Sequence, residues 1–278
     1  MSFTWSPHET PPDFQITLTG WCLVILRGVP ILLVLATGVV LMAALRLIER
    51  PLHGLSRPWT PGITVIVCRV CLWIMGIKRS VEGQITRHNG ALVANHSSWL
   101  DIFALNAATQ LYFVSKSEVA SWPGIGLLAK ITGTVFIARD RKEARSQQEM
   151  FEARLHEGHR LLFFPEGTST DNFRVLPFKS TLFEAFFHEN LRGTLYVQPL
   201  SVIYTAPQGQ DLRFYGWWGD MEFGPHALAL LATPAGGAVK VVCHPPLAVR
   251  DLPDRKALAA KTEAAVRSGM PVERQVSR

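Results

Sequence analysis

The stretch Ala91-Leu92-Val93-Ala94-Asn95-His96-Ser97-Ser98-Trp99-Leu100-Asp101 decides how the rest of the chain is interpreted. Its first four residues are apolar and predict a buried strand, and the polar residues after them predict a loop. Apolar periodicity then resumes, so a helix is expected to begin there, with Ser97 or Ser98 as its N-cap. His96 would lie in the loop and Asp101 in the first helical turn, where the carboxylate can bind one ring nitrogen. The other ring nitrogen would be free to act as a general base.

Outward from this stretch, apolar strands and helical segments alternate along the chain. Strands are predicted at residues 91–94, 111–114, 134–138, 161–164, 195–203, 213–215 and 239–243. Helices are predicted at residues 102–108, 142–156 and 181–189, with a further surface helix at 255–267 that ends at Gly269. This alternation predicts an α/β fold with a mixed, mostly covered sheet flanked by helices.

The N-terminal part of the chain has a different pattern and predicts a membrane-associated helical segment. Between Arg27 and Arg46 lie 18 uncharged, mostly apolar residues, and a second, shorter apolar run follows at 63–77. The first run is close to the length that crosses a bilayer. A transmembrane span, a hairpin in the membrane plane and a long buried helix all remain open. The predicted organisation is a polar segment at 1–20, a membrane helix or hairpin at 21–78, an α/β domain at 79–250, and a C-terminal helix and tail at 251–278.

Composition also favours a membrane partner. Of the 278 residues, 48% are hydrophobic and 18% are charged, and the net charge is +6. The Lys and Arg residues are scattered rather than massed in one patch, which favours an anionic membrane surface and argues against nucleic acid. Arg46, Arg50 and Arg57 follow the first apolar run, whereas Arg27 precedes it. This asymmetry predicts attachment to the inner (plasma) membrane with a cytoplasmic active site.

No metal site or redox pair is expected from the sequence. Cys68 and Cys71 have the spacing of such a pair, but they lie inside an apolar run with no second motif, so they are interpreted as small apolar residues of a helix. The string His156-Glu157-Gly158-His159 lacks the two-residue gap of a zinc-binding helix. A solvated helix end explains it better.

Two further segments hold residues suited to binding a polar or anionic head group. The strand at 134–138 is followed at once by Arg139, whose planar guanidinium can clamp an anion. The string Phe163-Phe164-Pro165-Glu166-Gly167-Thr168-Ser169-Thr170 ends another strand with a carboxylate, a glycine and three hydroxyl residues. Gly167 allows the backbone to approach a ligand closely, and the hydroxyls can bind polar oxygens.

Taken in order, four segments resemble the four motifs of the glycerolipid acyltransferase family, over roughly residues 75–205. These segments are His96 to Asp101, Gly133 to Arg139, Phe164 to Thr168, and Val197-Gln198-Pro199-Leu200. The resemblance implies that His96 is the base and that Asp101 orients it. It also implies an acceptor site made by Arg139, Glu166, Gly167 and Thr168, with Pro199 as the proline of the fourth motif.

The chain departs from the family pattern at one position. Many members have an arginine where this chain has Ser169, and Lys179 is expected to replace that cation in part. The segment 214–221 also resembles a subgroup found among bacterial lysophospholipid and lyso-ornithine lipid acyltransferases.

The resemblance implies a 1-acyl-sn-glycerol-3-phosphate O-acyltransferase. Such an enzyme moves an acyl chain from a thioester of acyl carrier protein or coenzyme A to a membrane lysophospholipid, making phosphatidic acid without a bound cofactor. A lyso-ornithine lipid O-acyltransferase is the alternative. A lipid esterase is less favoured because no Gly-x-Ser-x-Gly elbow occurs. A silent lipid-binding scaffold is disfavoured because His96, Asp101 and Glu166 are all present.

Overall fold

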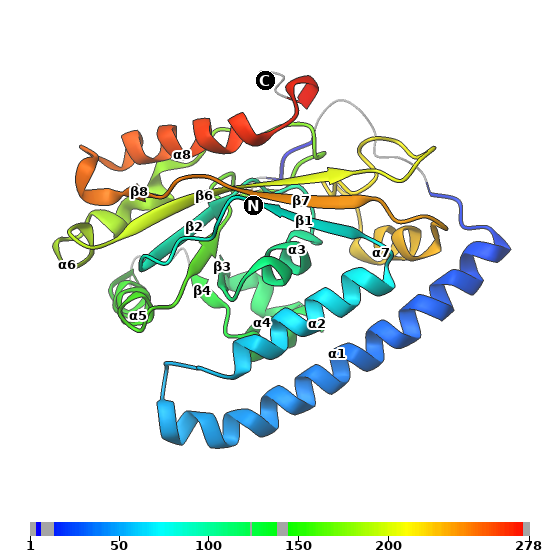
Figure 1. Cartoon of the computed structure of the whole chain (residues 1–278), viewed down its shortest axis with the longest axis horizontal. Coiled ribbons are helices and arrows are strands. Elements are labelled where there is room, and N and C mark those ends of the chain that lie inside the picture. Colours follow the sequence, from blue (N-terminus) through cyan, green and yellow to red (C-terminus); the bar gives the residue numbers. More distant parts are fainter. Residues whose placement is uncertain (1–3, 7–13, 123, 138–143, 275–278) are drawn as a thin grey trace.

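Eight strands form one mixed sheet in the computed structural model, which describes residues 4–6, 14–122, 124–137 and 144–274 (Figure 1). The strands are β1 (Lys78–Glu82), β2 (Gly90–Ala94), β3 (Tyr112–Lys116), β4 (Val135–Ile137), β5 (Leu161–Phe163), β6 (Tyr196–Thr205), β7 (Ala238–Cys243) and β8 (Leu247–Ala248). Their order is β1-β7-β6-β2-β5-β3-β4, with β8 also paired to β6. β7 and β8 run antiparallel to β6, and the other pairs are parallel. The C-terminal ends of β2, β5 and β3 therefore meet at one edge of the sheet.

Helices cover both faces of this sheet and give each face its own apolar core. They are α3 (Asp101–Ala108), α4 (Ile125–Thr132), α5 (Ala144–His156, with side chains described from 149), α6 (Glu189–Arg192), α7 (Phe223–Ala232) and α8 (Arg255–Gly269). Along β2, Ala91 and Val93 pack into one core and Leu92 and Ala94 into the other. All four side chains are fully buried, as expected for a parallel strand that is covered on both faces. These observations confirm the predicted mixed α/β fold.

The N-terminal segment is a helical hairpin that lies along the α/β domain (Figure 1). Its first helix, α1 (Leu18–His53), packs beside its second, α2 (Thr60–Ile74), and α2 in turn packs on α3. The fully buried carboxylate of Glu49 joins the two helices, because it accepts hydrogen bonds from the backbone N–H groups of Trp59 and Thr60 at 2.7 and 3.0 Å. Near the other end of α1, the Arg27 guanidinium donates to the carbonyl oxygens of Leu231 and Thr233. One end of α1 is therefore joined to α2, and the region near its other end is fixed to the α/β domain.

Three local expectations differ from the structure. Residues 213–215 form a turn instead of a strand, because the Asp211 carboxylate accepts the Arg213 backbone N–H at 2.7 Å. The helix predicted at 181–189 is the 3₁₀ segment Ser180–Phe187 followed by α6. Phe183 and Phe186, three residues apart, both bury in that 3₁₀ segment, whose period is three residues. The sequence analysis also missed α4, which begins directly after Gly124, as well as α7, β1 and β8.

Candidate active site

The predicted catalytic residues gather at the edge where three parallel strands end. His96 follows β2, the Glu166–Thr170 segment follows β5, and Lys116 ends β3. In an open α/β sheet the carboxyl ends of the strands are the usual place for a ligand. Three segments that lie up to 74 residues apart in the sequence thus meet at one place.

His96 and Asp101 form the dyad that their spacing predicted. Nδ1 of His96 lies 2.7 Å from Oδ2 of Asp101. A carboxylate only accepts hydrogen bonds, so Nδ1 carries the proton and Nε2 is the basic nitrogen. Nε2 makes no hydrogen bond to the described part of the chain. The His96 ring stacks on Phe164 with 4.0 Å between centroids, and 20% of the histidine side chain is exposed.

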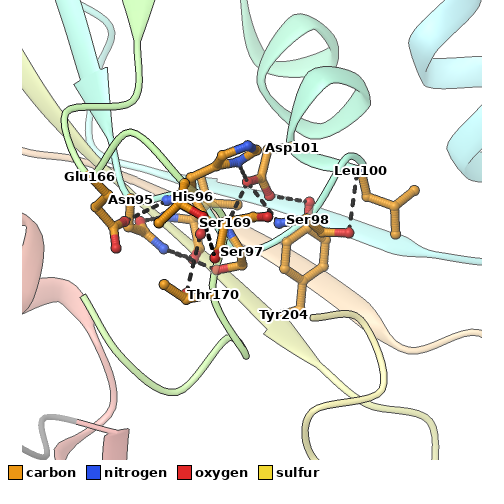
Figure 2. A network of polar contacts seen from close by, with 12 residues as sticks. Asn95, His96, Ser97, Ser98, Leu100, Asp101, Glu166, Ser169, Thr170 and Tyr204 are labelled. Atoms are coloured by element: carbon orange, nitrogen blue, oxygen red, sulfur yellow. Dashed lines mark hydrogen bonds and ion pairs between the residues drawn. The ribbon is translucent and has the colours of Figure 1, made fainter. Parts of the chain in front are cut away.

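Asp101 is held by more donors than the sequence indicated (Figure 2). Its Oδ2 also accepts the backbone N–H groups of Ser97 and Ser98, at 2.8 and 3.1 Å. Its Oδ1 accepts the hydroxyl of Tyr204 at 2.8 Å. Burial and the neighbouring Asp101 charge hold the pKa of Tyr204 well above its usual value, so the hydroxyl keeps the proton that it donates. The carboxylate is fully buried and cannot turn away from His96 without losing these bonds.

The loop that carries His96 is fixed from two sides. The side chain of Asn95 pairs with β6 as a strand would: its Nδ2 donates to the Val202 carbonyl oxygen at 2.9 Å, and its Oδ1 accepts the Val202 N–H at 2.8 Å. The Thr170 backbone N–H donates to the His96 carbonyl oxygen at 2.9 Å. The imidazole is therefore held in place on a loop with little freedom to move.

Glu166 lies inside the protein, behind the loop, with 1% of its surface exposed. Its Oε1 accepts the His96 backbone N–H and its Oε2 accepts the Leu176 backbone N–H, both at 2.7 Å. Burial raises the pKa of Glu166 to about 8, although the two N–H donors act in the opposite direction. The sequence predicted Glu166 as an acceptor-binding residue. Because both oxygens are engaged by backbone, we propose that it positions His96.

We expect Glu166→Gln to destabilise the protein by about 1–3 kcal/mol, because an amide nitrogen cannot accept a hydrogen bond and one buried N–H loses its partner. The folded pKa of Glu166, about 8, lies above its ordinary value of 4.5. The folded protein therefore binds more protons between these pH values, and the stability that this group contributes falls as the pH rises from 4.5 to 8. Chemical denaturation across that range should show a flatter pH dependence in the variant. The exposed Glu184→Gln is the matched control, and an equal loss in both variants would contradict the assignment.

Two lysines lie beside the Gly167 backbone. Lys116 Nζ donates to the Gly167 carbonyl oxygen at 3.1 Å. Gly167 has a φ of 73°, which favours glycine, and a Cβ there would lie 2.6 Å from Lys179 Nζ. The predicted residue Thr168 adjoins this glycine, and its hydroxyl oxygen accepts the Trp5 backbone N–H at 3.2 Å. The structure thus brings Lys179, Gly167 and Thr168 together, and it adds Lys116, which the sequence analysis did not assign.

Two other predicted residues stand apart from this group. Pro199 is buried within β6, level with Val93 of β2, so it lies in the sheet rather than at the loop edge. Arg139 lies outside the described residues. β4 ends at Ile137, which pairs with Lys116 at the end of β3. Among the residues that the structure describes, no three His, Cys, Asp or Glu side chains are grouped so as to hold a metal ion.

The aromatic segment at 214–221 packs against the catalytic loop. The Trp217 backbone N–H donates to the Ser97 carbonyl oxygen at 2.9 Å, one residue from His96. The indole nitrogens of Trp217 and Trp218 are buried and have no hydrogen-bond partner in the described part of the chain. The sequence pointed to this segment through its resemblance to one subgroup, but not to its contact with the dyad.

Comparisons with known proteins identify relatives of this chain. A family model described as Acyltransferase matches residues 78–203. The lyso-ornithine lipid O-acyltransferase of Rhodobacter capsulatus is 58% identical over 96% of this chain and 96% of its own length. The 1-acyl-sn-glycerol-3-phosphate acyltransferase of Neisseria gonorrhoeae is 41% identical over 35% of this chain and 39% of its own.

A solved structure shares the fold. The 1-acyl-sn-glycerophosphate acyltransferase of Thermotoga maritima superposes with a TM-score of 0.54 at 18% identity, covering 87% of this chain and 95% of the other. The family expected from the four motifs is thereby confirmed, and so is the expectation of an enzyme. The chain belongs to the glycerolipid acyltransferase family and is an acyltransferase.

Proposed function

We propose that this acyltransferase transfers an acyl chain from a thioester to the hydroxyl of a lyso-ornithine lipid. The observation that carries the proposal is the 58% identity, over nearly the whole chain, to a lyso-ornithine lipid O-acyltransferase. Phosphatidic acid synthesis, the first choice from the sequence motifs, is supported less, because relatives with that name match a much smaller part of this chain.

The reaction follows from the dyad geometry. Nε2 of His96 removes the proton from the acceptor hydroxyl as its oxygen attacks the thioester carbonyl carbon. Asp101 stabilises the imidazolium that forms, because it lies 2.7 Å from Nδ1 and is buried. When the tetrahedral intermediate collapses, the carbon–sulfur bond breaks and the imidazolium returns its proton to the leaving thiolate. The products are an O-acylated lipid and a free thiol, and no acyl-enzyme is required.

The residues around the dyad favour an acceptor without a phosphate monoester. Ser169 stands where many family members carry an arginine, so one cation suited to a phosphate is missing. Lys116 and Lys179 still provide positive charge beside Gly167. A single carboxylate, as in an ornithine head group, needs fewer cations than a phosphate dianion. The Trp217 backbone N–H binds the Ser97 carbonyl oxygen, so the aromatic segment contacts the loop that carries His96. A change in this segment can therefore change which acceptor fits beside His96.

The apolar hairpin supports a position of the enzyme at a membrane. α1 has 36 residues, with many large apolar side chains exposed along it, and it is long and apolar enough to cross a membrane. A straight helix of that length measures ~54 Å, well beyond the ~30 Å hydrocarbon core. Because α1 is also tied to α2 and α7, we propose that the hairpin lies in the interface of the inner membrane, with the active site on the cytoplasmic side. There the thioester of acyl carrier protein or coenzyme A would be the donor.

Two acceptors offered side by side would test this proposal. Purified protein should acylate lyso-ornithine lipid in preference to lysophosphatidic acid, with the products identified by mass spectrometry and both acyl donors supplied. Preference for lysophosphatidic acid would overturn the proposed acceptor and favour phosphatidic acid synthesis. Formation of free fatty acid instead of an acylated lipid would indicate an esterase.

A substitution at Ser169 would test whether this position contributes to the preference between the two acceptors. Ser169→Arg restores the family's cation, and we expect it to shift the ratio of the two acceptor rates toward lysophosphatidic acid by about tenfold. Ser80→Arg adds the same charge at an exposed position of β1, the edge strand of the sheet, and should leave the ratio unchanged. An unchanged ratio in Ser169→Arg would show that this position does not select the head group.

A further inference from the structure

A polar cavity of about 150 Å³ opens near the start of the strands whose other ends carry the dyad. Its lining includes Ser56, Arg57 and Pro58 of the α1–α2 turn, Tyr112 of β3, and His159 and Arg160 before β5. Tyr112 and Ala91 both pair with Leu161, so the cavity lies level with the start of β2. His96 is five residues farther along, or ~16 Å at 3.3 Å per residue. A head group bound here would therefore lie away from the catalytic nitrogen.

Arg57, which lines this cavity, and Arg154, which packs on the ring of the lining residue Tyr112, have no anionic partner among the described residues. Arg154, only 6% exposed, lies 4.3 Å from the centroid of the Tyr112 ring and donates to the Gly133 carbonyl oxygen at 2.8 Å. Arg57 lies 5.8 Å from the centroid of the same ring. The Nε atoms of both arginines are buried without a hydrogen-bond partner, and no described carboxylate forms an ion pair with either. Buried guanidinium nitrogens without an acceptor are costly unless an anion satisfies them.

The charges around the cavity remain positive when every neighbouring element is considered. Arg46 and Arg50 of α1 add repulsion to Arg57, and the carboxylate of Glu49, which is bound to Thr60 and Arg46, offsets part of that repulsion. Glu157 lines the cavity but is exposed.

The environment of His159 also indicates an excess of positive charge beside the cavity. It is 5% exposed, and its Nδ1 has no hydrogen-bond partner in the described residues, while its Nε2 lies 3.2 Å from the Ser56 carbonyl oxygen. Burial, with the charges of Arg154 and Arg57, lowers the pKa of His159 to about 4. A bound anion would relieve this repulsion. The turn holds Arg57 in an unusual backbone conformation: its φ is 47°, which a residue with a side chain rarely adopts.

We propose that this cavity is a binding site for a phosphate group, separate from the acyl-transfer site. Forked guanidinium groups match phosphate oxygens, and the cavity is many times larger than the ~10–15 Å³ that one water requires. Exposed apolar side chains lie at the end of α1 and in the α1–α2 turn that carries Arg57: Leu47, Ile48, Leu52, Leu55 and Trp59. An apolar tip beside a basic cavity is the arrangement expected where a protein touches a bilayer. The phosphate of an anionic membrane lipid is therefore the favoured source, and free phosphate is the other.

Binding measurements on the full-length protein would test the site without relying on acyl transfer. The probes are vesicles of phosphatidylcholine with and without phosphatidylglycerol, and inorganic phosphate alone. Arg57→Asn removes one guanidinium and keeps a residue that tolerates positive φ. We expect it to weaken the phosphatidylglycerol-dependent part of vesicle binding about tenfold. Arg250→Gln removes one exposed positive charge elsewhere and should change binding less than twofold.

A second measurement uses the unmodified protein. The imidazole NMR signals of His159 should shift when either probe saturates the cavity, because an anion beside Arg57 raises the proton affinity of the ring. A shift with lipid but not with inorganic phosphate identifies a lipid head group as the ligand, and a shift with both identifies phosphate in general. Equal losses in Arg57→Asn and Arg250→Gln, or an unmoved His159 with both probes, would overturn the proposal.

Discussion

Replacing His96 with alanine is expected to lower the rate of acyl transfer roughly a thousandfold, the range that a positioned general base supplies. The loss should appear in kcat, because Nε2 acts on the proton during the reaction and Nδ1 is engaged by Asp101. Folding should survive. The loop is tied through the His96 backbone, by Glu166 and Thr170, and alanine retains both of those hydrogen bonds.

The matched control is His156→Ala, which removes an exposed imidazole from the end of α5. Its kcat should equal that of the unmodified protein. Thermal unfolding of both variants would separate a chemical loss from a folding loss. Substantial turnover by folded His96→Ala would remove the general-base role from the mechanism.

Replacing Asp101 with asparagine is expected to lower kcat about a hundredfold, less than the loss of the base itself. The four donors around the carboxylate explain why. Oδ2 accepts from His96, Ser97 and Ser98, so asparagine would keep its oxygen there and turn its NH₂ group toward Tyr204. The tyrosine oxygen can accept that bond. The tautomer of His96 would then survive, and the variant would lack only the negative charge that stabilises the imidazolium.

This arrangement predicts a folded variant with nearly unchanged KM for the lipid. Asp251→Asn, an exposed aspartate next to Arg250, is the control for loss of one negative charge. Steady-state kinetics with saturating thioester would measure both constants. A folded Asp101→Asn enzyme with the unmodified kcat would contradict the pairing of the two residues.

Much of the dyad could be predicted from local sequence. The apolar run at 91–94 and the polar residues after it allow only a strand, a loop and a helix start, and this places His96 near Asp101. Tyr204 could not be found in this way, because its contact with Asp101 depends on the parallel pairing of β6 with β2. The predicted strand in fact ended one residue before it.

The contacts of Glu166 also could not be predicted from local sequence. Its motif marked it as functional, but a sequence does not tell whether a carboxylate at a strand end faces solvent or backbone. The two N–H groups that bind it come from His96 and Leu176, which lie on different sides of Glu166 in the sequence. Only the folded loop brings them together.

The N-terminal helices were predicted by their apolar composition, but their arrangement was not. A helix that crosses a bilayer and one that lies along a domain have similar apolar content. The difference lies in long-range contacts, such as the one between Arg27 and the carbonyl oxygens at the end of α7. The basic cavity beneath the α1–α2 turn was missed for the same reason, since its arginines come from distant parts of the sequence.

The most direct test of the account is the stoichiometry of thiol release by the unmodified protein. With an acyl thioester and lyso-ornithine lipid both present, each thiol released should be matched by one O-acylated lipid, and omission of the lipid should abolish release. That result would agree with direct transfer by His96 to the acceptor hydroxyl. Sustained thiol release without lipid, with free fatty acid as the product, would contradict it.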